Sequence, residues 1–457
     1  MPPADRQGLA LLIGAIDDRF RKDFSSSPAS RDPLPSIEDI TGQPHKIVEC
    51  RILKLQAIRT WAVAPPDGIG GRFWLIVKIT TDSKIEGIGE CYGIPFSSDI
   101  ACKMVEDTFA RFVAGEDPHH IETLFRRVYS AGFTQRPDLT LMGVFSGIEI
   151  AIWDILGKMA DAPVHRLLGG KFHERLRTYT YLYPENPGDL KAPDVYHDGD
   201  IAAERALHYL DLGFSAIKQD PAGPYGFQGG RELSRKELAR SEYCMRRIRE
   251  AVGDRADILF GTHGQMTTSS AIRLARRIEP YDPLWFEEPC PPDQMEAIGK
   301  VARSTSIPVA TGERLTTRVE FHQALKAGVS ILQPNVGRSG GIWETKKIAQ
   351  MAELFNAQIA PHIYCGPIAH AAAAHLSFGC PNFLILETIQ SPFHDAILKK
   401  RLRWEDGYML APEEPGLGIE LDEEVALAHS APAGSGLHLE MCQVPLPSDN
   451  EKTITEL

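Results

Sequence analysis

The sequence has few of the features that mark secreted, membrane-spanning or disulfide-rich proteins. None of its eight cysteines forms a Cys-x-x-Cys pair, which favours free thiols over a disulfide framework. The apolar stretch at 8–16 is preceded by Asp5 and followed by Asp17 and Asp18, which argues against a signal peptide. No apolar run approaches the roughly 20 residues that cross a bilayer. We therefore expect a cytoplasmic protein with no membrane partner.

Positive charge is also scarce. Lys and Arg number 49 against 61 Asp and Glu, so the net charge is −12, and without a basic patch we expect no nucleic-acid partner. The 457 residues suit two or three domains. Because 43% of them are apolar and 24% charged, the chain can bury a large core.

The first half of the chain divides into an extension and an α+β unit. Residues 1–46 are expected to contain a short helix at 7–24 and a Pro- and Ser-containing linker, or alternatively to form an ordered arm in an oligomer. Residues 47–175 are expected to form a capping domain of strands followed by helices. The strand-like runs lie at 52–63, 73–79 and 85–92, and the helical patterns at 100–113, 121–129 and 143–159.

From residue 176 onwards, short apolar runs alternate with helical stretches. The eight expected strands lie at 177–182, 216–219, 258–260, 284–287, 309–311, 330–333, 358–361 and 383–387. Eight β–α repeats favour a parallel barrel over an open doubly wound sheet. The sequence therefore predicts an α/β protein, a modified (β/α)8-type barrel at 176–395 with an N-terminal α+β capping domain. The Pro/Gly-rich segment 396–457 is expected to return to that capping domain.

Polar residues stand where these strands end. They are Lys218, Asp220, His263, Glu287, Glu313, Asn335, His362 and Glu387. The carboxyl ends of barrel strands converge on one face, where active sites of this fold lie. Seven successive strand ends with such residues indicate a single site.

Several ordered motifs carry a resemblance to a known family. They are Gly147–Asp154 with Leu168–Gly170, Trp285–Pro289, Ala310–Glu313, Gly337–Gly341, Ala360–His362 and Gly366–Ile368. Over about residues 48 to 425, the chain resembles the mandelate racemase subgroup of the enolase superfamily, and within it the galactonate dehydratase-like sugar-acid dehydratases. The resemblance implies a capped, modified barrel, Mg²⁺ as cofactor and assembly into a homo-oligomer.

The expected chemistry explains why the site is expected to hold a divalent metal ion. Removing the proton α to a carboxylate makes an ene-diolate, whose charge a hard divalent cation held by carboxylates stabilises. The resemblance implies Glu287 and Glu313 as metal ligands. Family members supply an Asp where this chain has Gly261, so we expect Asp220 to complete the site. His263 is a second candidate ligand, which would favour Mn²⁺.

Two histidines are candidates for acid–base catalysis. His362 resembles the general base of the family, and His263 matches the acid that expels hydroxide in galactonate dehydratase. Relatives orient the base with an Asp, where this chain has Asn335. An amide holds the ring without lending charge, and such a change beside a catalytic histidine can impose the wrong tautomer.

The remaining candidates concern substrate binding. Lys218 has two interpretations of equal weight: a contact to the substrate carboxylate or a second base, and an ion pair with Asp220 or a glutamate. Glu387 is expected to polarise the carboxylate, as its family counterpart does. Trp61, Tyr92 and the loop 68–71 are expected to cover the substrate and exclude water.

The favoured function is dehydration of an aldonate or aldarate to a 2-keto-3-deoxy acid, with a small-molecule carboxylate as the only expected partner besides copies of the chain. A racemase, epimerase or cycloisomerase is the alternative. His263 and His362 end the third and seventh of eight expected barrel strands, which lie on opposite sides of a barrel, and histidines placed in this way also suit two-base proton exchange. Gly261 and Asn335 motivate a third interpretation, a binding protein on an inactivated barrel.

Overall fold

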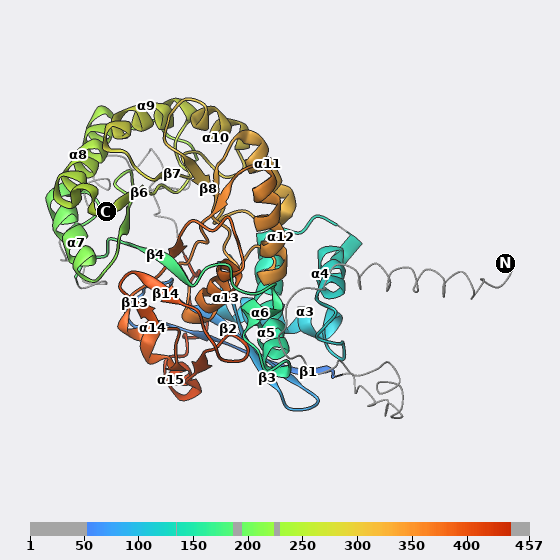
Figure 1. Ribbon diagram of the computed structural model, residues 1–457. Coiled ribbons are helices and arrows are strands. Elements are labelled where there is room, and N and C mark those ends of the chain that lie inside the picture. The colour runs from blue at the N-terminus through green and yellow to red at the C-terminus, as the bar shows by residue number, and fades with distance from the viewer. Residues whose placement is uncertain (1–52, 134, 186–193, 224–228, 440–457) are drawn as a thin grey trace, which may run out of the picture. The chain divides into compact units, whose positions relative to one another are not determined.

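The computed structural model describes residues 53–133, 135–185, 194–223 and 229–439 (Figure 1). The helix expected at 7–24, the linker after it and the boundary at residue 46 lie outside the described residues.

The capping domain is built on an antiparallel sheet of β1 (Leu55–Val63), β2 (Trp74–Thr81) and β3 (Glu86–Cys91), with β2 in the centre. Helices α3 (Ser98–Phe112), α4 (Ile121–Tyr129) and α5 (Leu139–Met159) follow, with η1 (Ala131–Phe133) between the last two. A side chain at Gly87 or Gly89 would overlap carbonyl oxygens of α5, so these glycines allow the helix to lie directly on β3.

Helix α5 corrects one expectation. It has 21 residues and a mean hydropathy of 1.7, long and apolar enough to cross a membrane by length and composition, whereas the sequence was expected to contain no such run. In the structure, 83% of the 18-residue apolar stretch within this helix is buried inside the protein. The helix is apolar on all sides because it lies between β3 and the barrel helix α12 (Gly341–Leu354).

Eight parallel strands form the barrel domain, as predicted. Seven pair in chain order, and they are β4 (Arg175–Tyr181), β5 (Ala216–Gln219), β6 (Asp257–Phe260), β7 (Trp285–Glu287), β8 (Val309–Thr311), β9 (Ile331–Leu332) and β10 (Gln358–Ile359). The eighth, β11 (Leu386–Glu387), pairs with β4, and a parallel bridge between Ile359 and Phe383 links β10 to the segment before β11. The strand order never reverses, so the doubly wound alternative is wrong.

Helices surround these strands (Figure 1). Besides α12, they are α7 (Gly199–Asp211), α8 (Arg235–Val252), α9 (Thr268–Ile278), α10 (Met295–Ala302), α11 (Thr317–Ala327) and α13 (Pro367–Phe378), with η2 (Gly253–Arg255) and η3 (Glu279–Tyr281). Apolar side chains from the eight strands and the residues beside them fill the interior: Tyr179, Ala216, Leu259, Trp285, Ala310, Ile331, Ala360 and Ile385. This packed layer leaves the carboxyl ends of the strands for polar residues.

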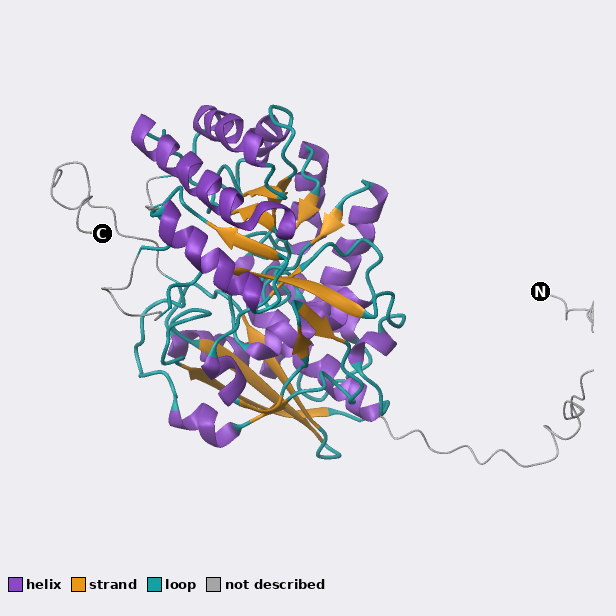
Figure 2. Ribbon diagram, turned by 60° about the vertical axis from the view of Figure 1, so that its left-hand side comes forward, coloured by secondary structure: helices purple, strands orange, loops and turns teal. Residues whose placement is uncertain are grey.

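The remaining elements are α6 (Val164–Leu167), α14 (Pro392–Ala396), β12 (Leu398–Lys400), β13 (Trp404–Glu405), β14 (Tyr408–Leu410), β15 (Glu420–Leu421) and α15 (Glu423–Ala428). β14 pairs antiparallel with β4. After β15, Glu423 forms ion pairs with Arg59 and Lys78, and Ser430 bridges to Val63 of β1. Figure 2 shows the three-stranded capping sheet and the barrel strands from a second side.

Two buried carboxylates of the capping domain hold the starts of barrel helices. Glu149 of α5 accepts N–H bonds from Ile342 at 2.7 Å and Trp343 at 2.8 Å, at the beginning of α12. Glu90 of β3 accepts them from Gly366 at 2.5 Å and Ala369 at 3.0 Å, at the beginning of α13. A carboxylate there satisfies backbone donors and complements the helix dipole. Because α12 and α13 follow Asn335 and His362, these contacts position the site.

Candidate active site

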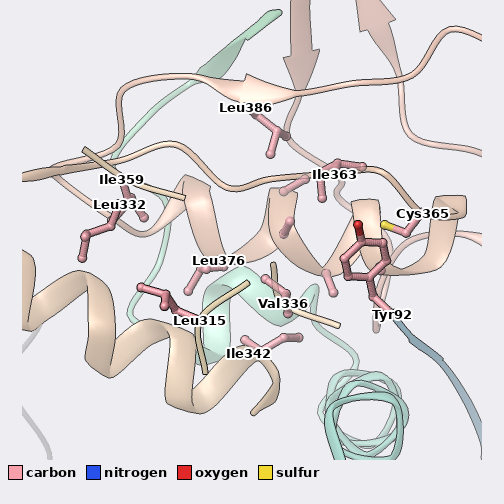
Figure 3. Packing of buried hydrophobic residues seen from close by; sticks show 14 of the residues in the cluster. Tyr92, Leu315, Leu332, Val336, Ile342, Ile359, Ile363, Cys365, Leu376 and Leu386 are labelled. Carbon is pink, nitrogen blue, oxygen red and sulfur yellow. The ribbon is translucent and has the colours of Figure 1, made fainter. Parts of the chain in front are cut away.

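The strand ends bring Lys218, Asp220, Glu287, Glu313, Asn335, His362 and Glu387 into buried positions, and His263 joins them through Asp220. An apolar layer lies close by: Figure 3 shows Tyr92 of the capping domain beside Ile363 and Cys365 of the segment that carries His362.

Lys218 and Glu287 form a fully buried ion pair. Trp285 Nε1 donates a second hydrogen bond, 2.9 Å long, to the same carboxylate, and the ammonium lies 4.8 Å from the centre of the Tyr181 ring. Burial alone would lower the pKa of Lys218, but the charges of Glu287, Glu387 and Glu313 outweigh it and raise the pKa above its ordinary value. Lys218 is therefore an ammonium ion, in the ion pair with a glutamate that was one of its two interpretations.

Gly261 makes room for this lysine. A Cβ atom at Gly261 would lie 2.9 Å from Lys218 Cε and 2.9 Å from Tyr181 Oη. Any side chain at this position therefore requires Lys218 to move. The absence of an aspartate at position 261 and the buried position of Lys218 therefore depend on each other, because a side chain at position 261 would occupy space next to Lys218.

His263 is bonded to Asp220, with 2.7 Å between Nδ1 and Oδ2. The other carboxylate oxygen of Asp220 accepts the N–H of Ala222 at 3.2 Å. Burial lowers the pKa of His263, but the hydrogen bond and charge of Asp220 and the charge of Glu313 outweigh it and raise the pKa to about 9. Asp220 thus supports the imidazolium form of His263.

His362 lies between a carboxylate and an amide. Its Nε2 is 3.1 Å from Glu313 Oε2, and its Nδ1 is 3.0 Å from Asn335 Nδ2. Burial lowers the pKa of His362; Glu313 opposes this, but the charges of Lys218 and Arg338 add to it, and the pKa falls to about 3. His362 is therefore neutral, whereas His263 is charged.

The negative charge of Glu313 acts on both histidines, since it raises the pKa of each. Burial raises the pKa of Glu313, but the positive charges of His263, Arg314 and Lys218 oppose it, and the pKa lies well below its ordinary range. Arg314 itself forms hydrogen bonds of 2.9 and 2.5 Å with the buried Glu288.

Arg338 is a site residue that sequence reasoning missed. It donates to the carbonyl oxygens of Glu313 at 3.1 Å and Gly93 at 3.0 Å, and its guanidinium lies 4.5 Å from the centre of the Tyr92 ring. The only available signal was a single arginine in the glycine-rich turn 337–341 after β9.

Glu387 and the capping residues complete the surroundings. Glu387 accepts the N–H of Ile363 at 2.6 Å, and burial, only partly offset by Lys218, raises the pKa of Glu387 to about 7. The Tyr92 ring lies 5.4 Å from the His362 ring, and Ile69 of the loop 68–71 packs against Tyr183 and Ile389.

Trp61 lies elsewhere. It packs into the hydrophobic core from β1, with the Arg59 guanidinium 4.9 Å from its ring centre. Of the two aromatic residues expected to cover the substrate, the structure therefore brings Tyr92, and not Trp61, against a catalytic candidate.

The three predicted metal ligands do not form a carboxylate cluster. Among the described residues, no group of three His, Cys, Asp or Glu side chains is placed to hold a metal ion. Asp220 is hydrogen-bonded to His263, Glu287 forms an ion pair with Lys218, and Glu313 lies 3.1 Å from Nε2 of His362. Mg²⁺ requires near-octahedral oxygen ligands. These residues, as arranged, do not fit the Mg²⁺ site that the family implies.

Comparison with known proteins agrees with this fold. Residues 68–169 match the mandelate racemase/muconate lactonizing enzyme N-terminal domain, and residues 201–425 match the enolase C-terminal domain-like family. A mandelate racemase/muconate lactonizing enzyme from Sulfitobacter sp is 53% identical with a TM-score of 0.84, over 86% of this chain and 99% of that one.

Curated relatives include sugar-acid dehydratases. The D-galactonate dehydratase of Xanthomonas euvesicatoria pv. vesicatoria (strain 85-10) is 34% identical over 386 residues, 82% of this chain and 93% of the relative. The D-xylonate dehydratase of Haloferax volcanii is 32% identical over 364 residues, 78% and 85% of the two chains. With both domains matched and the strand-end residues in place, the chain belongs to the mandelate racemase/muconate lactonizing enzyme family of the enolase superfamily.

Proposed function

We propose that the protein is a hydro-lyase that dehydrates a sugar acid, an aldonate or aldarate, to a 2-keto-3-deoxy acid. One observation carries this proposal. His263 and His362 come from the ends of β6 and β10, both interact with Glu313, and their surroundings hold one charged and the other neutral. Two titratable groups whose surroundings separate their protonation states are typical of paired acid–base chemistry. The dehydratase relatives point to the same reaction.

Water loss from a sugar acid requires three catalytic contributions from the protein. A base removes the proton next to the carboxylate, positive charge stabilises the ene-diolate, and a proton reaches the departing hydroxyl. Lys218 supplies buried positive charge at the strand ends. Glu387, whose burial raises its pKa to about 7, can donate a hydrogen bond to the substrate carboxylate when protonated. Tyr92 and the loop 68–71 limit the access of water.

Metal dependence is a separate part of the proposal. Enolase-superfamily sites use Mg²⁺ to stabilise the ene-diolate. Because Asp220, Glu287 and Glu313 are engaged by His263, Lys218 and His362, we assign no step to a metal. Every assay therefore includes arms with Mg²⁺, with Mn²⁺ and with a chelator.

The test is a screen of aldonates and aldarates, with the 2-keto-3-deoxy product detected as its semicarbazone. We expect at least one acid to lose water, and His119→Asn, a change at an exposed histidine, to retain that activity. A screen in which no acid loses water in any metal arm would refute the proposed function.

A second function is favoured by the same two histidines. Bases on opposite sides of a carbanion can exchange protons and so epimerise an acid. NMR of the screened acids separates the two functions: an epimer formed without the keto product would establish an epimerase.

A further inference from the structure

We propose that Asn335 holds His362 as the neutral tautomer with its proton on Nε2, so that the Asp220–His263 pair is the base that removes the α-proton. This inference rests on the proposed function. It differs from the roles that the family resemblance implies, in which His362 is the base and His263 the acid, because His263 here transfers the proton in both steps and His362 only donates a hydrogen bond.

The orientation of the Asn335 amide is fixed by two backbone groups. Its Oδ1 accepts the N–H of Gly337 at 2.9 Å, and its Nδ2 donates to the carbonyl oxygen of His362 at 3.2 Å. Rotating the amide by 180° would set donor against donor at Gly337 and acceptor against acceptor at His362. The amide nitrogen therefore faces His362 Nδ1, 3.0 Å away.

The orientation of the amide decides the tautomer of His362. Because Asn335 Nδ2 is only a donor, His362 Nδ1 must accept, and a neutral imidazole then carries its proton on Nε2. The other side of the ring is compatible with this tautomer, since Nε2 lies 3.1 Å from the Glu313 carboxylate, whose negative charge favours a proton on the nitrogen that faces it. With aspartate at position 335, Nδ1 would donate and Nε2 would carry the lone pair that a base needs.

The arrangement that is missing at His362 is present at His263. A carboxylate oxygen of Asp220 lies 2.7 Å from Nδ1 and accepts a hydrogen bond from it, and we assign proton exchange with the substrate to the other ring nitrogen, Nε2. Asp220 is a positioning residue that also stabilises the imidazolium formed when His263 takes a proton. In the family the carboxylate partner belongs to the histidine at the position of His362, whereas in this protein it belongs to His263.

The proton balance follows from these tautomers. His263 Nε2 takes the proton from the carbon next to the carboxylate, and the electron pair of that C–H bond delocalises into the carboxylate as an ene-diolate. His362 keeps its proton and donates a hydrogen bond, because a neutral imidazole that gave it up would become an imidazolate. The bond to the neighbouring hydroxyl then breaks, and the His263 imidazolium returns its proton to form water. The enol product becomes the 2-keto-3-deoxy acid by taking one solvent proton at that neighbouring carbon.

The first experiment reads the tautomer without any substrate. Long-range ¹H–¹⁵N NMR spectra of protein labelled with ¹⁵N-histidine distinguish Nδ1–H from Nε2–H rings, and the signals missing in His362→Asn identify His362. We expect Nε2–H in the wild type and Nδ1–H in Asn335→Asp. An Nδ1–H ring in the wild type would overturn the inference, whatever the enzyme's substrate.

The second experiment follows the α-proton of the acid found in the screen. In D₂O, we expect His362→Asn to retain exchange or removal of that proton at a reduced rate, and His263→Asn to lose it, with His119→Asn as the control. The opposite pattern would overturn the inference while leaving the dehydratase function intact. If no acid loses water, the proposed function fails, and the tautomer measurement still decides the structural part.

Discussion

Two sets of buried glutamates serve opposite purposes in this protein. At the strand ends, Glu287 and Glu313 face the side chains of Lys218 and His362. Between the capping and barrel domains, Glu90 and Glu149 instead face backbone N–H groups at the starts of α13 and α12. Side-chain partners can exchange protons or be displaced, whereas backbone amides cannot. The same residue type is therefore chemical in one region and structural in the other.

The sharpest way to separate the two regions is His263→Asn. We expect this change to lower kcat/KM by about 10³-fold, within the range of a lost general acid–base residue, while the melting temperature stays close to that of the wild type. Steady-state kinetics and thermal unfolding on the same samples check both parts. A loss of activity matched by a large fall in melting temperature would contradict the assignment.

The opposite result is expected at Glu149→Ala. Three donors, from Ile342, Trp343 and the Trp153 indole, lose their acceptor inside the protein. We expect the free energy of unfolding to fall by about 3 kcal/mol. Denaturant unfolding measures it, and Glu250→Ala, at an exposed ion pair on α8, is the control with an expected change of less than about 0.5 kcal/mol. Equal effects of the two changes would remove the contrast between the regions.

The pH profile tests which histidine is the base. A base works in its deprotonated form, and Asp220 raises the pKa of His263 to about 9 against the burial that lowers it. We therefore expect kcat/KM to rise about tenfold per pH unit from neutral pH and to level off near pH 9. Asp220→Asn removes the carboxylate that raises the pKa of His263, so the midpoint of the kcat/KM profile should move to lower pH.

A base at His362 would give a different profile. Burial holds the pKa of His362 at about 3, so His362 is deprotonated throughout the neutral range and its profile would be flat there. A flat profile from neutral pH upwards would therefore count against His263.

The smallest expected effect concerns the metal. Lys218→Ala combined with Gly261→Asp releases Glu287 and places a carboxylate where Lys218 Cε now leaves no room. We expect calorimetric titration to show Mg²⁺ binding about tenfold tighter than in the wild type, a gain of about 1.4 kcal/mol. Gly261→Asp alone, which meets Lys218, is the matched control. Equally tight binding by the wild type would show that its carboxylates already form a metal site.

The sequence predicted the barrel well because its strands are short apolar runs between amphipathic helices. The expected strands at 216–219 and 309–311 coincide with β5 and β8. The strand ends also follow from this periodicity, so the gathering of Glu313 and His362 was predictable. Which of these side chains would pair with one another was not predictable, because pairing depends on how far side chains reach between neighbouring strands.

Asp220, expected as a metal ligand, shows this limit most clearly, because it is bonded to His263. Contacts between distant segments were equally hidden. Glu149 and Arg338 were visible only as members of family motifs, and Glu90 carried no pattern, although each of the three links the capping domain to the barrel. Such links join residues hundreds of positions apart, which local periodicity does not report.

The most direct measurement is the composition of the product formed in D₂O by the wild-type enzyme. The account predicts that a sugar acid loses water and yields a 2-keto-3-deoxy acid with one deuterium on the carbon that carried the departing hydroxyl. Recovery of the acid with deuterium next to its carboxylate, and without any keto product, would contradict it.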